Sequence, residues 1–162
     1  MNTKDTKLFV QRALVLLVFL AVAAISSKII AAAGAQDRRA SVWAGVYSDA
    51  QADRGRALYD GHCRMCHGRY LEGAPAVPSE SPTSGRPPLI GWEFRGNWNQ
   101  MTLGDLLERI RISMPQNAIG SLTRQQVADI LAYVLRENGY PPGIDEMPPD
   151  KAQLDTIWIE GW

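Results

Sequence analysis

The sequence is poor in cysteine and histidine, with two residues of each among 162. It also lacks any block of lysine and arginine, and its 17 basic residues equal its 17 acidic ones. Without a basic patch or a basic helix face, a protein is a poor candidate for binding nucleic acid, so we expect no such partner. The length and the 46% apolar content predict one globular domain with a core of ordinary size.

The sequence also lacks an uncharged run of membrane-spanning length. Its longest apolar run, Ala13–Ile25, has thirteen residues, whereas a spanning helix needs about 20. Basic residues precede this run and the small residues Ala33-Gly34-Ala35 follow it, which is typical of a signal peptide over residues 1–35. If the Lys28 side chain snorkels, the segment is instead one uncleaved N-terminal membrane anchor. Both interpretations export the domain, so we expect a periplasmic location.

All the cysteine and histidine lies in one stretch, His62-Cys63-Arg64-Met65-Cys66-His67. A disulfide across a two-residue gap closes a small strained loop and contributes little stability. A thioredoxin-like dithiol belongs to an alternating strand–helix pattern, which this sequence lacks. The four side chains are too crowded to surround a zinc ion tetrahedrally. The spacing Cys-x-x-Cys-His is instead the haem-attachment signature of c-type cytochromes.

This signature predicts one covalently bound haem c, with thioether bonds to Cys63 and Cys66 and His67 as the proximal iron ligand. His62 stands beside an anchored cysteine and is expected to be a surface or packing residue. For the sixth iron ligand we predict Met114, which lies between two expected helices, where Pro115 favours an extended backbone. The other candidates lie in the attachment turn, at a helix start or after the last helix: Met65, Met101 and Met147.

Three helices are expected around this signature, which predicts an all-α fold. A capping box of Ser48 and Gln51 begins the first, which should end near Asp60, with Gly61 releasing the chain. The second spans residues 102–112, and the third begins at Thr123 and ends at Asn138-Gly139.

Two further expectations concern packing. Gly55 lies inside the first helix, where glycine costs about 1 kcal/mol relative to alanine, so we expect another helix, with Tyr133, to cross closely there. Residues 72–88 read as a loop with an exposed insertion at 78–86. The aromatic residues that follow are expected to cover either the porphyrin or other protein groups: Trp92, Phe94 and Trp98.

From Val46 to Pro149 the sequence resembles class I c-type cytochromes, most closely the small monohaem domains that accompany quinoprotein alcohol dehydrogenases. The resemblance rests on Gly55-Arg56-Ala57-Leu58-Tyr59, Cys63-Arg64-Met65-Cys66-His67-Gly68, Pro87-Pro88-Leu89, Leu103-Gly104-Asp105-Leu106, Met114-Pro115, and Gly120-Ser121-Leu122 with Val127 to Tyr133. It implies the cytochrome c fold and a proline, Pro87, whose carbonyl orients the His67 ring. The insertion leaves Pro75 and Pro88 as alternatives for that role.

These inferences give a signal peptide or anchor at 1–35, a linker at 36–47, a monohaem cytochrome c domain at 48–142 and a C-terminal extension at 143–162. The expected function is single-electron transfer between redox-partner proteins, from a donor dehydrogenase to an acceptor oxidase or another cytochrome, without enzymatic activity of its own. One alternative is the cytochrome subunit of a quinoprotein dehydrogenase complex. Another is a haem-based gas sensor or peroxidase-like module, which needs an open position on the iron.

Overall fold

The computed structural model describes residues 40–74 and 85–161, which all belong to one compact unit. The predicted signal peptide or anchor and most of the 78–86 insertion lie outside the described residues. The elements in chain order are β1 (Ala40–Ser41), the short 3-10 helix η1 (Val42–Ala44), α2 (Asp49–His62), α3 (Arg64–His67), α4 (Gly91–Trp98), α5 (Leu103–Ser113), α6 (Arg124–Glu137), α7 (Lys151–Leu154) and β2 (Ile157–Trp158). The fold is therefore mainly helical, which confirms the predicted all-α class. Within these two ranges, no helix is both long enough and apolar enough to span a bilayer.

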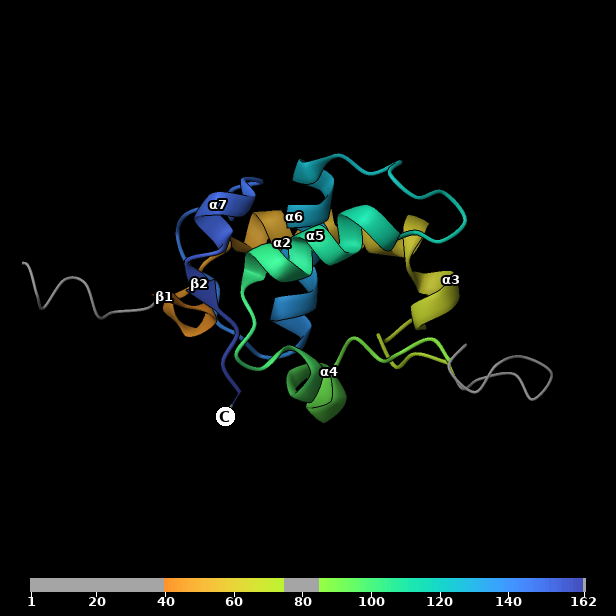
Figure 1. Ribbon diagram of the computed structural model, residues 1–162, viewed down its shortest axis with the longest axis horizontal. Helices are drawn as coiled ribbons and strands as arrows, with labels where there is room; N and C mark the ends of the chain where they lie inside the picture. Colours follow the sequence, from red (N-terminus) through yellow and green to blue (C-terminus); the bar gives the residue numbers. More distant parts are fainter. Residues whose placement is uncertain (1–39, 75–84, 162) are drawn as a thin grey trace, which may run out of the picture. The chain divides into compact units, whose positions relative to one another are not determined.

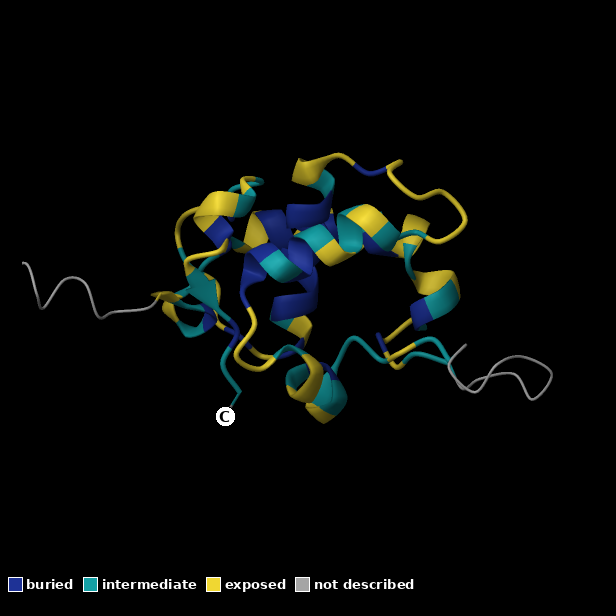
Figure 2. Cartoon of the chain, viewed as in Figure 1, coloured by how far each residue is buried: buried dark blue, intermediate teal, exposed yellow. Residues whose placement is uncertain are grey.

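Helices α2, α5 and α6 form the centre of the unit, with α3 toward one end and α7 toward the other (Figure 1). The predicted second and third helices are confirmed as α5 and α6. Each begins with a complete capping box, Thr102 with Asp105 and Thr123 with Gln126. Helix α6 is buried from residue 127 to residue 135 and lies at the centre of the core, whereas its first and last residues are exposed (Figure 2).

The close helix crossing predicted at Gly55 is confirmed. A Cβ atom added at Gly55 would overlap the carbonyl oxygen of Asp129 and lie 2.5 Å from its carbonyl carbon and 3.0 Å from the Cβ of Tyr133. The rings of Tyr59 and Tyr133 then pack beside the crossing, with centroids 5.3 Å apart. Glycine therefore lets the backbones of α2 and α6 approach, and this contact fixes the helix that leads to the cysteines.

The start and end of α2 differ from the prediction. The Ser48 hydroxyl accepts from the Gln51 backbone as expected, but the Gln51 side chain does not return to Ser48. It is fully buried and instead accepts from the Met147 N–H at 2.7 Å and donates to the Met147 carbonyl at 3.0 Å. Leaving the buried N–H and carbonyl of Met147 without partners would cost more free energy than leaving the single N–H of Ser48 without the Gln51 side chain. The Gln51 side chain therefore pairs with Met147.

The prediction that Gly61 ends the first helix is wrong. Helix α2 continues to His62, and the N–H of Cys63 still bonds the carbonyl of Tyr59 at 2.8 Å. Glycine permits a chain reversal but does not force one. Helix α3 begins at the next residue, Arg64, so the attachment stretch is itself a helical turn rather than a loop.

The segments that flank residues 48–142 also pack on this unit. Strand β1 pairs in parallel with β2, with Ala40 opposite Ile157 and Ser41 opposite Trp158. Three apolar side chains of the C-terminal segment are buried: Met147, Leu154 and Ile159. The residues before Ser48 and after Pro142 thus contribute to the same core as the predicted domain.

Candidate haem site

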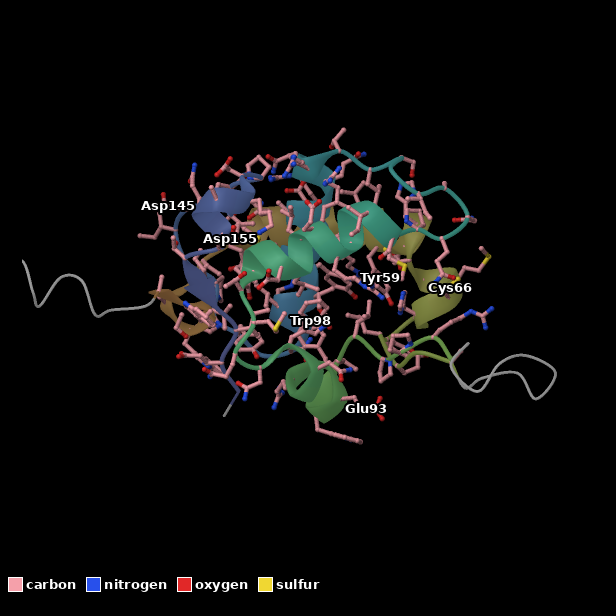
Figure 3. The ribbon with its side chains drawn as sticks, in the orientation of Figure 1. Tyr59, Cys66, Glu93, Trp98, Asp145 and Asp155 are labelled. Carbon is pink, nitrogen blue, oxygen red and sulfur yellow. The ribbon has the colours of Figure 1, made fainter. Side chains whose placement is uncertain are left out.

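The predicted site residues come from three separate parts of the fold. Cys63 follows α2, and Cys66 and His67 lie on α3. Pro87 lies in the segment before α4, and Met114 caps the C-terminal end of α5. The labelled side chains of Tyr59 and Cys66 lie in the same half of the molecule, the half that holds α3 (Figure 3).

The His67 ring is buried, with 8% of the residue exposed, and its Nδ1 atom lies 2.9 Å from the carbonyl oxygen of Pro87. A carbonyl oxygen only accepts hydrogen bonds, so Nδ1 must carry the proton in this contact. The lone pair of Nε2 is then available to a metal ion. The contact that the family resemblance implies for Pro87 is therefore present, and it leaves His67 in the tautomer that an iron ligand requires.

Cys63 and Cys66 are not joined by a disulfide, and both are partly buried. Burial raises the pKa of the Cys63 thiol to about 11, and the neighbouring Cys66 adds to the rise. A redox-active or nucleophilic cysteine needs a lowered pKa, because the thiolate is the reactive form. The Cys63 thiol therefore lacks the lowered pKa that the dithiol chemistry of other Cys-x-x-Cys motifs uses.

Met114 has the extended backbone that Pro115 predicts, with φ −128° and ψ 151°. Its N–H still bonds the carbonyl of Ile110 at 2.8 Å, so the position of the residue is fixed by the end of α5. Met65 is 85% exposed, and Met147 is buried in the core, where Gln51 holds its backbone. Met114 remains the predicted sixth ligand.

The three aromatic residues predicted as cover are arranged in three different ways. Trp92 is 80% exposed, Phe94 is buried in the core, and Trp98 is partly buried against it. His62 is exposed, as expected for a surface residue.

The contacts around the segment that follows His67 were not predicted. The hydroxyl of Tyr59 donates to the carbonyl of Gly68 at 2.8 Å, and the N–H of Gly73 donates to the carbonyl of His67, also at 2.8 Å. Burial raises the pKa of the Tyr59 phenol, so the phenol remains a hydrogen-bond donor at neutral pH. Tyr59 thus connects the α2–α6 crossing to the residue after the predicted iron ligand.

A model of a protein family matches residues 50–134, more than half of the chain, and the match includes both cysteines, His67 and Met114. The protein is therefore a c-type cytochrome, the class in which a covalently bound haem transfers electrons. The matching family is described as cytochrome c oxidase, cbb3-type, subunit III, and the chain belongs to it. No curated protein and no solved structure matches the chain significantly. The narrower resemblance to the cytochromes of quinoprotein alcohol dehydrogenases is not confirmed.

Proposed function

We propose that this protein is an exported cytochrome with a single haem c that passes one electron at a time between redox partners. Cys63 and Cys66 attach the haem, His67 and Met114 bind its iron, and Pro87 orients the His67 ring. When bound, the haem supplies one-electron chemistry between ferrous and ferric iron. The polypeptide supplies attachment, the identity of the ligands and a surrounding from which water is largely excluded.

The observation that carries this proposal is the contact between the buried His67 ring and the Pro87 carbonyl, 2.9 Å away. A metal-ligating histidine characteristically donates its second ring N–H to a carbonyl or carboxylate, which fixes the tautomer and raises the basicity of the ligating nitrogen. The two thiols of the attachment signature lie one and four residues before this ring. A packing histidine has no need of this combination.

The first experiment measures the absorption of the purified protein after denaturation in alkaline pyridine. We expect the spectrum of haem c, at one haem per chain, in a protein recovered from the periplasmic fraction. A colourless protein, or a pigment that acidic organic solvent extracts, would contradict covalent attachment at Cys63 and Cys66.

The second experiment tests Met114 as a ligand. A thioether opposite histidine stabilises ferrous iron and raises the potential relative to bis-histidine ligation, so Met114→Ala should lower the reduction potential. Met65→Ala is the matched control, because this methionine is close to the haem-attachment residues in sequence but exposed to solvent. If Met114→Ala and Met65→Ala have the same potential, the ligand is another residue. Rapid carbon monoxide binding by the unmodified protein would favour the gas sensor instead.

The family description favours a second candidate, in which the protein is the electron-carrying subunit of a larger oxidase. The other candidate subunit is the cytochrome of a dehydrogenase complex, which would accept electrons from the dehydrogenase. Both place the same haem site in a complex, so purification under mild conditions distinguishes them from a free carrier. Recovery with a larger oxidase or dehydrogenase supports a subunit, and recovery of a fully redox-active single chain supports the free carrier.

A further inference from the structure

Residues 71–74 and 86–89 are hydrogen-bonded to each other, and His67 and Pro87 meet beside them. Ala74 and Arg86 exchange two backbone hydrogen bonds, of 2.9 and 3.0 Å, and the N–H of Leu89 donates to the carbonyl of Leu71 at 2.8 Å. We call residues 71–74 and 86–89 together the proximal clasp. The Pro87 carbonyl that contacts His67 lies between these two sets of hydrogen bonds, so the clasp determines its position.

Gly73 lies at the closest approach of the two halves of the clasp. A Cβ atom added there would overlap the carbonyl oxygen of Arg86 and lie 2.7 Å from the nitrogen of Pro88 and 2.9 Å from the carbonyl carbon of Pro87. All three are backbone atoms, so no side-chain rotation relieves the overlap. Because the N–H of Gly73 is bonded to the carbonyl of His67, withdrawal of Gly73 would either lengthen this hydrogen bond or move the predicted ligand.

A second feature shows how firmly the clasp is held. Leu71 has a φ of 62°, a left-handed conformation that a leucine rarely adopts. Such a conformation persists only where the surroundings enforce it. Here the Leu71 side chain is buried and its carbonyl accepts the hydrogen bond from Leu89, so packing and hydrogen bonding together maintain it.

We propose that Gly73 is a positioning residue for the predicted iron ligand. Its missing side chain sets how closely residues 86–88 approach, and thereby sets the strength of the hydrogen bond between His67 and Pro87. This inference rests on the proposed role of His67. A weaker bond leaves the imidazole a poorer electron donor, which destabilises ferric iron and raises the reduction potential.

The test compares Gly73→Ala with Gly139→Ala. Gly73 has a φ of 73° and Gly139 a φ of 81°, so alanine is conformationally strained at both, but an added Cβ at Gly139 meets no atom within 4 Å. The readouts are the exchange rate of the His67 Nδ1 proton with solvent, by ¹⁵N nuclear magnetic resonance of the reduced protein, and the reduction potential. We expect exchange about tenfold faster in Gly73→Ala than in Gly139→Ala, as for loss of one ordinary hydrogen bond, together with a higher potential.

A folded Gly73→Ala protein whose exchange rate and potential equal those of Gly139→Ala would overturn the proposal. If Gly73→Ala does not fold, Arg86→Pro compared with Arg86→Ala decides the question, because both lose the arginine side chain, neither adds an atom at Gly73, and only proline lacks the N–H that bonds Ala74. Faster Nδ1 exchange and a raised potential in Arg86→Pro relative to Arg86→Ala support the clasp, and equal values refute it. If the wild-type protein carries no covalent haem, the proposed function fails, while the same exchange comparison still tests the clasp.

Discussion

Replacing Gly55 with alanine tests the crossing on which the whole site depends. The added methyl group would overlap the main chain of α6 at Asp129, and the shift needed for a normal contact exceeds 1 Å. Neither backbone can rotate away, so one helix must move. Helix α2 leads directly to Cys63, and Tyr59 holds the residue after His67, so displacement of α2 carries into the haem-attachment segment.

Two opposing effects set the size of the change. Alanine in place of a helical glycine contributes about 1 kcal/mol of stability. Overpacking a well-packed contact costs about 1–3 kcal/mol, and a clash with backbone atoms belongs at the upper end. The net expectation is a loss of about 2 kcal/mol in the free energy of unfolding, which for a domain of this size lowers Tm by about 8 °C.

The assay is thermal unfolding followed by circular dichroism, together with the yield of covalently attached haem per chain. Gly61→Ala is the control, because Gly61 lies in the same helix and an added Cβ would contact no atom within 4 Å. We expect Gly61→Ala to be as stable as the wild type or more stable, and Gly55→Ala to lose both stability and haem. A Gly55→Ala protein that matches Gly61→Ala in both measurements would refute the packing argument.

Two further outcomes follow from other hydrogen bonds. Gln51→Ala leaves the buried N–H of Met147 without its acceptor and should lower the free energy of unfolding, measured in urea, by about 3 kcal/mol. The control Gln153→Ala, at an exposed position, should change this free energy by less than about 0.5 kcal/mol. Equal values for the two variants would contradict the role of Gln51. Hydrogen bonds from the Thr102 hydroxyl and N–H lower the pKa of Asp105 in the folded protein. Asp105 therefore contributes to folding stability above its pKa in the unfolded chain, and this contribution is lost as the pH falls through its lower pKa in the folded protein. Between pH 7 and about pH 3, Asp105→Asn should therefore lose less stability than the wild type in denaturant titrations, and equal losses would exclude this linkage.

Apart from the helix crossing at Gly55, the features of the fold that were predicted correctly depend on residues close in sequence. Thr102 and Thr123 cap their helices through partners three residues later, so the pattern alone indicates the helix start. Gln51 has the same spacing from Ser48, but its side chain pairs with a residue 96 positions away. Helix α4 was not predicted, because no side chain caps its start at Ile90.

The residues of the candidate site likewise fall into those predicted from local patterns and those that depend on contacts distant in sequence. The attachment signature and the Met114-Pro115 pair are local patterns, and each was predicted from neighbouring residues. The role of Pro87 was accessible only through a resemblance, because 20 residues separate it from His67. Gly73 had no recognisable signal, since a glycine required by close backbone contact looks in sequence like any other glycine of a loop.

The two predicted iron ligands differ in how the protein holds them. His67 is constrained at three points, by the Cys63 carbonyl that accepts from its N–H, by the Gly73 N–H that bonds its carbonyl, and by Pro87 at its ring. Met114 is held by one backbone bond at the end of α5, and the residues from 116 to 121 that follow it are exposed. Because stability is lower where fewer contacts are made, changes in this exposed segment act on the site through the methionine, whereas changes in the clasp act through the histidine. Under the proposed ligation, Met114 and His67 are thus held by different parts of the fold, and the Met114 and Gly73 variants address them separately.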